Sequence, residues 1–452
     1  MASEATWNPG LWMAAGGQLP PDWKLVPFVD LLESPKSIAV GVMYPGDHVH
    51  DGIPLVRVGD VHEGGVIAEP QMRVSAQVHH EYRRTELRGD ELLITLVGKP
   101  GACVIARPQM RGWNVARALA VVRLRSPSLR PYLKAVLESS VMKSIILGML
   151  NTTVQPTLNL KEIKSLPVPL PADEKIAGLI GGVSELFNRR IDLLRQTNTI
   201  LESIAQALFK SWFIDFDPVR AKQAGREPEG MDAATAALFP AEFQESALGL
   251  IPKGWTEGVL GNVCTNPRSQ AKPGQMPSDT PYVGLEHMPR RRIALDEAGT
   301  AEGLESGKFW FERNDVLFGK LRPYFHKVAL APCRGICSTD ILVIRPLQNH
   351  YLGFVTMHAF SDELIAHTTL LSNGARMPRT SWHDIEAYKV VLPDAAIVEA
   401  FDCVSRPLFE RIYSNIEAAR TLAKLRDTLL PRLISGKLRL PEAQEQLEEA
   451  LA

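Results

Sequence analysis

The chain has 452 residues, of which 45% are hydrophobic and 22% charged, and its formal net charge is −1. This length is too great for one ordinary domain and suits two domains with connecting elements, and the composition is typical of soluble globular proteins. No stretch approaches eighteen uninterrupted apolar residues, so no membrane span is expected. Residues 1–18 lack a basic start followed by an apolar run, so no signal peptide is expected either. We expect a cytoplasmic protein.

Cysteine usage fits a reducing compartment. The five cysteines are few, odd in number and scattered: Cys103, Cys264, Cys333, Cys337 and Cys403. Cys333 and Cys337 are spaced CxxxC, which matches neither a redox CxxC pair nor half of a zinc site with a second half nearby. The sequence therefore predicts no metal site.

The sequence contains a long internal repeat. The segment 19–23 (LPPDW) opens one copy, and 251–255 (IPKGW), at an offset of 232, opens the other. An offset of 222 then holds over a long stretch, where Pro156, Ile163 and Leu186-Phe187-x-Arg189 recur as Pro378, Ile385 and Leu408-Phe409-x-Arg411. A constant offset over such a stretch indicates a true duplication.

The repeat divides the chain into seven segments. In order, we predict an N-terminal extension (1–18), a first globular domain (19–171, domain 1), a central helix (172–216), a connector (217–250), a second globular domain (251–393, domain 2), a distal helix (394–438) and an acidic tail (439–452). Both domains hold short β-type runs, such as 91–97 and 340–344, with a few helical stretches such as 132–147. The connector holds at most a short helix at 233–238. The predicted fold class is α+β: two α/β domains separated by two long helices that form an antiparallel coiled coil, with a pseudo-two-fold internal repeat.

A long amphipathic helix is predicted after each domain. Asp173 and Asp394 lie at the two starts, where a short polar side chain can cap free N–H groups. The distal helix carries a looser apolar stripe between Phe401 and Leu433. In the central helix, two seven-residue series are predicted to form the contact seam: Ile180, Phe187, Leu194, Leu201 and Leu208, and the partly polar Ile176, Val183, Arg190, Thr197 and Ile204. Ordinary core packing would also explain such stripes, but two of similar length after two equivalent domains favour mutual pairing.

Three segments carry a family resemblance. The run 207–222 (ALFKSWFIDFDPVRAK), with GREPEGM at 225–231, and the run 425–438 (LRDTLLPRLISGKL) are long and specific, and 314–324 (NDVLFGKLRPY) lies in domain 2. The first two resemble the central and distal conserved regions of the DNA-specificity subunits of bacterial type I restriction-modification systems. The third resembles a segment common in the target-recognition domains of that family. The resemblance covers the chain from Leu19 to Leu438.

The resemblance implies a division of labour. Domains 1 and 2 would be target-recognition domains that each read half of a split site in double-stranded DNA, and the paired helices would hold the halves a fixed distance apart. The helices would also dock two methyltransferase subunits, which use S-adenosylmethionine to methylate adenine. Restriction/translocase subunits, which use ATP and Mg, would complete the complex. The chain itself would be non-catalytic and hold no cofactor.

Motifs of the corresponding enzymes are missing from the sequence. An amino-methyltransferase needs an (Asn/Asp)-Pro-Pro-(Tyr/Phe) loop, and the segment 215–218 (DFDP) lacks the second proline. The segment 303–308 (GLESGK) is one residue short of the phosphate-binding GxxxxGK(S/T) loop. Glu162-Ile163-Lys164 has the Glu-x-Lys of many nucleases without an obvious preceding acidic partner. A fused methyltransferase or nuclease is therefore disfavoured, and a protein-only scaffold remains open, although it would leave the basic clusters without a purpose.

The candidate DNA contacts are basic residues next to polar or aromatic ones. They are Arg290, Arg291, Lys320, Arg322, Tyr324, Ser338 and Thr339 in domain 2, and Lys99, Asn114 and Arg117 in domain 1. Lys99 holds the place in domain 1 that Lys320 and Arg322 hold in domain 2. Arg can bridge guanine O6 and N7, Asn can read adenine, and Lys commonly meets phosphate. Any one of them, taken alone, could equally be a solvated surface charge.

Overall fold

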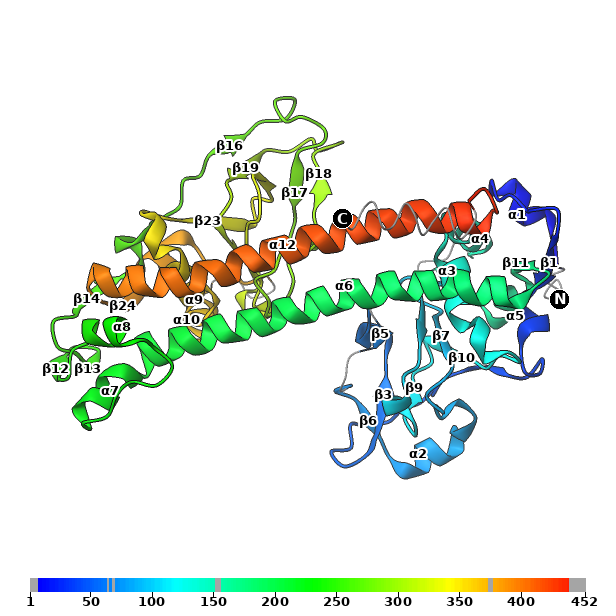
Figure 1. Ribbon diagram of the computed structural model, residues 1–452, viewed down its shortest axis with the longest axis horizontal. Helices are drawn as coiled ribbons and strands as arrows, with labels where there is room; N and C mark the ends of the chain where they lie inside the picture. Colours follow the sequence, from blue (N-terminus) through cyan, green and yellow to red (C-terminus); the bar gives the residue numbers. More distant parts are fainter. Residues whose placement is uncertain (1–6, 63–64, 67–69, 151–155, 373–376, 439–452) are drawn as a thin grey trace. The chain divides into compact units, whose positions relative to one another are not determined.

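The structure is a computed structural model that describes residues 7–62, 65–66, 70–150, 156–372 and 377–438; the predicted acidic tail lies outside these residues. The chain divides into two compact units, Met1–Asp192 with Arg420–Ala452 and Leu193–Ala419. The two long helices, α6 (Glu174–Phe209) and α12 (Ala395–Ile434), each contribute one segment to unit 1 and one to unit 2 (Figure 1). None of the described helices is long and apolar enough to cross a membrane.

Domain 1 is built on a four-stranded antiparallel sheet in unit 1. The strand order is β2 (Ile38–Val40), β10 (Leu119–Val122), β7 (Leu92–Thr95) and β8 (Cys103–Ile105). Every residue of β7 and β10 is buried, which explains why their sequences are continuous apolar runs rather than alternating ones. A second sheet contains β6 (Arg73–Val74), β3 (Ile53–Val56) and β9 (Asn114–Val115), with β3 and β9 parallel; β4 (Val61–His62) pairs with β5 (Gly65–Val66), and α2 (Ala76–Glu81) follows β6.

Three helices and a strand pair complete domain 1. The helices are α3 (Arg130–Glu138), α4 (Ser140–Met149) and α5 (Leu160–Ser165). The single helical stretch expected at 132–147 is broken at Ser139, whose backbone is extended and whose hydroxyl accepts the Met142 N–H at 3.2 Å, so Ser139 caps a new helix. Strand β1 (Trp23–Pro27) pairs antiparallel with β11 (Pro167–Pro171), which joins the beginning and the end of the domain.

Domain 2 repeats this topology in unit 2. Its four-stranded sheet has the order β15 (Cys264–Thr265), β23 (Ile341–Pro346), β20 (Val316–Gly319) and β21 (Val328–Leu330). Its second sheet is larger, with the order β16 (Gln270–Ala271), β19 (Lys308–Phe311), β22 (Gly335–Cys337), β17 (Pro281–Val283) and β18 (Gly299–Thr300). Strands β17 and β22 are parallel, as β3 and β9 are. Strand β14 (Thr256–Val259) pairs with β24 (Lys389–Leu392) and closes the domain.

The helices of the two domains keep the sequence offset. The helices α9 (Leu352–Phe360), α10 (Asp362–Leu371) and α11 (Trp382–Glu386) begin at positions 352, 362 and 382, and α3, α4 and α5 begin at positions 130, 140 and 160. Each pair of starts is therefore separated by the same offset of 222. Ser361 caps α10 through the Leu364 N–H at 3.1 Å, just as Ser139 caps α4. The predicted pseudo-two-fold repeat is confirmed in the fold.

The long helices pack against each other within each unit (Figure 1). In unit 1, the guanidinium of Arg426 donates to Asn188 at 2.7 Å. In unit 2, Asn415 donates to Asn198 at 2.8 Å, and further along the ring of Phe209 lies 6.2 Å from that of Phe401, so the helices are antiparallel. A buried polar pair of this kind fixes the register of two helices, because any shift leaves both amides unsatisfied.

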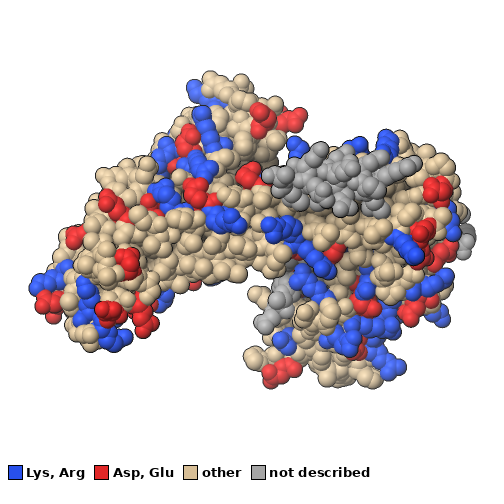
Figure 2. All heavy atoms as spheres, in the orientation of Figure 1, with Lys and Arg blue, Asp and Glu red and all other residues tan. Residues whose placement is uncertain are grey.

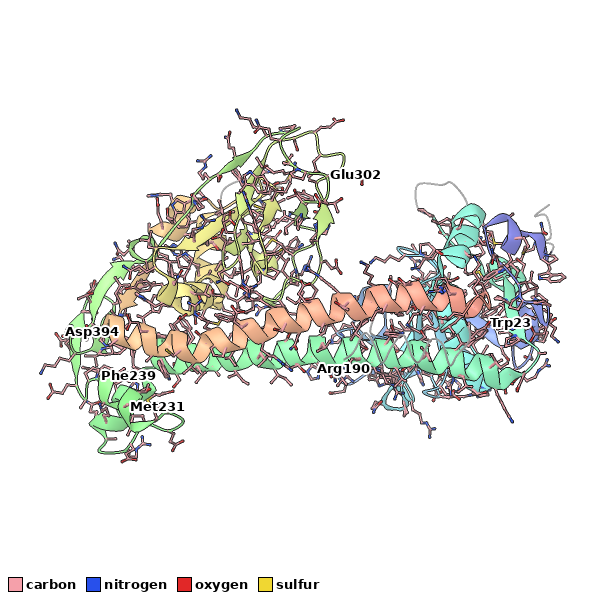
Figure 3. All side chains as sticks on the ribbon, turned by 45° about the horizontal axis from the view of Figure 1, so that its top comes forward. Trp23, Arg190, Met231, Phe239, Glu302 and Asp394 are labelled. Carbon is pink, nitrogen blue, oxygen red and sulfur yellow. The ribbon has the colours of Figure 1, made fainter. Side chains whose placement is uncertain are left out.

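One of the two predicted seams of α6 is wrong by one position. Ile180, Phe187 and Leu194 are buried as predicted, but Arg190 and Ile204 are exposed (Arg190 is labelled in Figure 3). The second buried series is Ala177, Ser184, Ile191, Asn198 and Ala205. These side chains are mostly small or polar, so the hydrophobic pattern did not predict that they are buried. The more apolar series Leu179, Leu186, Leu193 and Ile200 is exposed instead.

The motif at 207–222 forms an aromatic core in unit 2. After α6 the chain makes a wide π-helical turn (Lys210–Ile214), and Phe216, in the left-handed region at φ 55°, ends it. The Phe213 ring lies 5.0 Å from Phe401 and the Trp212 ring 5.2 Å from Phe239, both edge-on. The motif thus joins the central helix to the distal helix and the connector.

The connector contains more structure than predicted. The short helix expected at 233–238 is present as α8 (Ala233–Leu238), and Met231 and Phe239 on either side of it pack on the aromatic core (Figure 3). A further helix, α7 (Asp217–Gln223), was not predicted; it has a proline in its first turn. Strands β12 (Phe243–Ser246) and β13 (Gly249–Pro252) form a hairpin that leads into domain 2.

Unit 1 holds both ends of the described chain. In the N-terminal extension, Trp12 of α1 (Gly10–Ala14) is buried and its indole donates to the Gln18 carbonyl at 3.1 Å. After α12, Gly436 adopts a left-handed φ of 67°. A Cβ added to Gly436 would lie 2.3 Å from Pro20 Cγ, so the glycine permits both the helix end and its contact with the start of domain 1.

Candidate nucleic-acid interface

The candidate residues of domain 2 lie at the end of strand β20. Lys320 donates its N–H to the Asp340 carbonyl at 3.0 Å and accepts the Thr380 N–H at 3.0 Å. Arg322 has a left-handed φ of 52° and donates its N–H to the Pro378 carbonyl at 2.8 Å. The segment is therefore fixed between two others, and its side chains project from a rigid backbone.

Three cations and one carboxylate meet at this segment. Lys320 Nζ lies 4.0 Å from Asp340 Oδ1, and Arg379 Nε lies 3.3 Å from the same oxygen. Thr339 and Arg268 line the same hollow, of about 240 Å³, with Lys320 and Arg379. Ser338 is partly exposed beside it. Sequence reasoning missed Arg268 and Arg379, which lie far from the motif in the chain.

The second basic group of domain 2 surrounds Phe325. Arg290 stacks over this ring at 4.1 Å, Arg322 lies 5.8 Å from its centroid, and the ring of Tyr324 lies 4.9 Å away. Tyr324 is 50% exposed. Arg291 forms a 3.0 Å ion pair with Asp362. The structure thus brings Arg290, Arg322 and Tyr324 together, as a base-contacting loop would require, and engages Arg291 within the domain.

Two residues that follow Phe325 have shifted pKa values. Burial lowers the pKa of His326, whose Nε2 lies 2.9 Å from the Phe360 carbonyl oxygen, so the ring is a neutral donor at neutral pH. Burial and the neighbouring Arg290 lower the pKa of Lys327. The Lys327 ammonium donates to the Leu285 carbonyl, so it is held within the domain.

Domain 1 presents fewer candidates. Lys99 is exposed in the β7–β8 turn, where Gly98 and Gly101 both adopt left-handed φ (84° and 88°). Arg117 is exposed between β9 and β10. Asn114 is fully buried; it accepts the Thr85 hydroxyl at 2.8 Å, so in this structure its amide packs inside the domain and cannot reach a base.

A buried acid and an arginine hold the turn before β7 and before β20. Glu91 accepts the N–H groups of Arg88, Gly89 and Asp90 at 2.8–3.1 Å and lies 3.4 Å from Arg123 Nε. The Asp315 carboxylate takes a two-pronged pair from Arg345, at 2.7 and 2.6 Å. Arg345 stands at the repeat offset from Arg123, so the same scaffold pair was duplicated with the domain.

The remaining motifs have structural roles. Glu162 accepts the Asn159 N–H at 2.6 Å and so caps α5. All five cysteines are free. Among the described residues, no group of three His, Cys, Asp or Glu side chains is arranged to hold a metal ion.

Curated relatives place the chain by sequence. It is 22% identical over 444 residues to the MjaIX specificity subunit of Methanocaldococcus jannaschii, covering 94% of this chain and 96% of that one. It is 30% identical over 238 residues to the EcoBI specificity subunit of Escherichia coli, covering 51% of this chain and about half the length of that relative. The chain is a relative of type I restriction specificity subunits. The resemblance carried by the three sequence segments is confirmed.

Other comparisons add detail. The HindI specificity subunit of Haemophilus influenzae is 23% identical over 329 residues, covering 63% of this chain and 71% of that one. Among solved structures, the type I restriction-modification S subunit from M. genitalium aligns over 91% of this chain and 96% of that one, with a TM-score of 0.48 and 13% identity. No family model matches the chain.

Proposed function

We propose that this chain is the non-catalytic, DNA-reading subunit of a type I restriction-modification complex and that it recognises a two-part site in double-stranded DNA. The observation that carries the proposal is the duplication of a whole domain with a basic turn at the same place in each copy. Leu321 bridges to Arg379 in domain 2, and Val97 bridges to Thr157 in domain 1, so the segments bearing Arg322 and Lys99 leave equivalent strands in equivalent surroundings. The specificity-subunit relatives support this reading.

The two copies would read different bases. Domain 2 presents Arg290, Arg322 and Tyr324 around Phe325, whereas domain 1 presents Lys99 and Arg117. Two non-identical surfaces, one from each copy, suit two half-sites of unrelated sequence. Helices α6 and α12 would separate them, because 36 helical residues extend about 54 Å at ~1.5 Å per residue.

We further propose that α6 docks a helix of a methyltransferase subunit. Leu179, Leu186, Leu193 and Ile200 are spaced by seven and are 59%, 68%, 54% and 61% exposed. Residues seven apart share one face of a helix, and an apolar heptad face left in water is typical of a coiled-coil partner surface. The methyltransferase would bring S-adenosylmethionine, and restriction subunits would bring ATP and Mg.

The direct test is methylome sequencing of cells that express the chain with its methyltransferase. We expect adenine methylation at a motif of two short sequences separated by unread bases. Arg322→Ala should relax one half of the motif and Lys99→Ala should weaken recognition of the other. Arg226→Ala, on the exposed part of the connector, is the control and should leave the motif unchanged. Methylation at a continuous motif, or by the chain alone, would contradict the proposal.

The docking surface has its own test. Leu186→Glu with Leu193→Glu places two charges on the exposed face without touching the buried seam, so co-purification with the methyltransferase should be lost while the melting temperature is kept. Leu238→Glu, 41% exposed in the connector, is the matched control. Undiminished co-purification of the double variant would show that the subunit docks elsewhere.

A further inference from the structure

Two adjoining hollows in domain 1 are lined by several arginines, with fewer carboxylates among them (Glu86, Asp90, Glu185 and Asp192). One, of about 910 Å³, lies between the segment after β8, the start of α3 and residues 185–192 of α6. The other, of about 490 Å³, lies along residues 83–88, with Arg111 and Arg123. Arg88 and Arg111 line both hollows, which therefore form one continuous surface. We call it the arginine cleft and define it by its five exposed cations: Arg83, Arg84, Arg88, Arg107 and Arg111.

Positive charge is concentrated at the cleft in a protein whose net charge is close to zero. Residues 83–130 contain ten Lys and Arg, five of which define the cleft, against three Asp and Glu, in a chain of net charge −1. Figure 2 shows Lys and Arg side chains gathered on domain 1, with some acidic side chains among them. Arg83 and Arg84 pair with no carboxylate among the described residues, and Arg88 lies 3.8 Å from an equally exposed Glu33, a contact that water screens.

The backbone that carries these arginines is fixed from inside. Arg123 donates to the Arg84 carbonyl at 2.9 Å and to the Glu86 carbonyl at 2.8 Å. Glu91 holds the three N–H groups at 88–90. Arg111 donates through Nε to the Arg88 carbonyl at 3.3 Å. The backbone is therefore rigid, and cations that line one hollow on a rigid support repel one another unless an anion lies between them.

The cleft is separate from the predicted base-contacting turn. The turn at 88–91 precedes β7, whereas Lys99 follows it, so the two basic surfaces lie at opposite ends of the same strand. Domain 2 does not repeat the cleft. Glu312 takes the place of Arg88 there and pairs with Arg334 at 3.3 Å, and the adjacent Arg313 pairs with Glu410 at 2.5 Å. The scaffold therefore does not require a cation at the position of Arg88.

We propose that the arginine cleft binds the sugar-phosphate backbone of duplex DNA and anchors it independently of sequence. This rests on the proposed function, that the chain binds DNA. Guanidinium groups offer paired donors that match phosphate oxygens, and a row of them without a base-facing aromatic group suits the repeating charge of a DNA strand rather than its bases. The cleft would give domain 1 backbone contacts at a place where domain 2 carries the ion pair of Glu312 with Arg334.

The test compares charge-matched variants of the full-length chain in its co-purified assembly. Arg83→Gln/Arg84→Gln/Arg88→Gln removes three cleft charges while leaving Arg123 and Glu91 in place. Lys24→Gln/Lys36→Gln/Lys143→Gln removes three exposed charges of unit 1 outside both hollows. Each protein is titrated, at several salt concentrations, with a duplex containing the methylated motif, with a scrambled duplex and with poly-glutamate.

We expect the cleft variant to lose affinity for both duplexes alike and to keep its preference between them. Loss of three phosphate contacts should flatten the salt dependence, so that between 50 and 200 mM salt the wild type weakens about 40-fold more than the variant. If the variant matches the control in affinity and salt slope, the cleft does not bind DNA. If only poly-glutamate binding falls, the ligand is an acidic polypeptide and the proposal is wrong. Failure of the wild-type assembly to bind the motif duplex would instead contradict the proposed function.

Discussion

Domains 1 and 2 share one scaffold and differ in almost everything that scaffold presents to solvent. Sheet order, parallel pair, helix starts and the buried acid–arginine pair coincide. The surfaces differ. In domain 2, arginines surround Phe325 and the charged residues of the turn before β20 form ion pairs. In domain 1, Lys99 stands alone in its turn and the turn before β7 is basic. The difference teaches that the interior of the duplicated domain is constrained by folding, while each copy has acquired its own electrostatic surface.

The largest expected effect concerns the shared acid–arginine pair. Arg345→Ala leaves the Asp315 carboxylate, which is 1% exposed, without its main partner, so we expect a loss of about 3–5 kcal/mol in the free energy of unfolding of unit 2. Arg123→Ala should cost less, about 1–3 kcal/mol, because Glu91 keeps three backbone donors. Urea unfolding measures both. Equal losses would mean that the two pairs do the same structural work.

The next effect concerns the carboxylate of Glu202 in α6, because the equivalent position of α12 carries no carboxylate. Glu202 is 2% exposed and accepts the Ala294 N–H at 2.9 Å, and burial raises its pKa to about 7. Because the folded state binds this proton more tightly than the unfolded state, stability falls as pH rises from about 4.5 to 7. Glu202→Gln should therefore add about 2–3 kcal/mol at pH 8 and little at pH 4.5.

The repeat offset leads from Glu202 to the exposed Lys424 of α12. Lys424→Gln is thus the matched control and should leave the pH dependence of unfolding unchanged. A Glu202→Gln protein whose stability still falls between pH 4.5 and 8 as steeply as the wild type would show that another group titrates.

The last effect, of similar or smaller size, concerns a helix contact found in both units, with the glycine on the long helix in unit 1 and on the domain helix in unit 2. In unit 1 a Cβ on Gly181 of α6 would lie 2.4 Å from the Tyr132 backbone nitrogen, and in unit 2 a Cβ on Gly353 of α9 would lie 2.2 Å from the Ser405 hydroxyl of α12. The backbone of Tyr132 cannot move away from an added methyl group as easily as the Ser405 hydroxyl can. We expect Gly181→Ala to cost about 2–3 kcal/mol and Gly353→Ala about 1–2 kcal/mol.

A second substitution separates the two cases. Ser405→Ala added to Gly353→Ala should recover part of the stability in thermal or urea unfolding, because it removes the nearest atom. No side-chain truncation should rescue Gly181→Ala. Equal costs without rescue would show that the two helix contacts are alike.

Sequence reasoning succeeded where a physical constraint acts along the chain. The offset of 222, the long helices, the fold class and the helix at 233–238 all follow from periodicity and repetition. The cap at Asp173 was also predictable, and its carboxylate accepts the Lys175 N–H at 2.9 Å. The second seam of α6 was not, because Ala177, Ser184 and Asn198 pack by size and hydrogen bonding rather than by hydrophobicity.

The candidate site could be predicted less well, because it depends on which residues meet in the folded domain, and the sequence does not show this directly. Asn114 looked like an adenine reader from its neighbours, yet it lies inside domain 1 against Thr85. The arginine cleft draws on positions 83 to 111, which short 3-10 helices and strand β8 bring together, and Arg379 approaches Lys320 from a much later segment of the chain. The sequence signal for the cleft was the excess of positive charge between residues 83 and 130, and a search for short motifs does not detect such an excess.

The strand pairs at the base of the domains have a consequence for how such a protein can change. Trp23 faces Pro171 across β1 and β11, and Thr256 faces Leu392 across β14 and β24, so each domain leaves the chain and returns to it at one place. A segment bounded by such a strand pair can be replaced by another that closes in the same way, provided that it supplies the same packing on the long helices, as Phe354 does against Phe213. Under the proposed function, exchange of the DNA between these codons would change the specificity of one domain in one step, whereas point substitution in the buried strands would mostly cost stability.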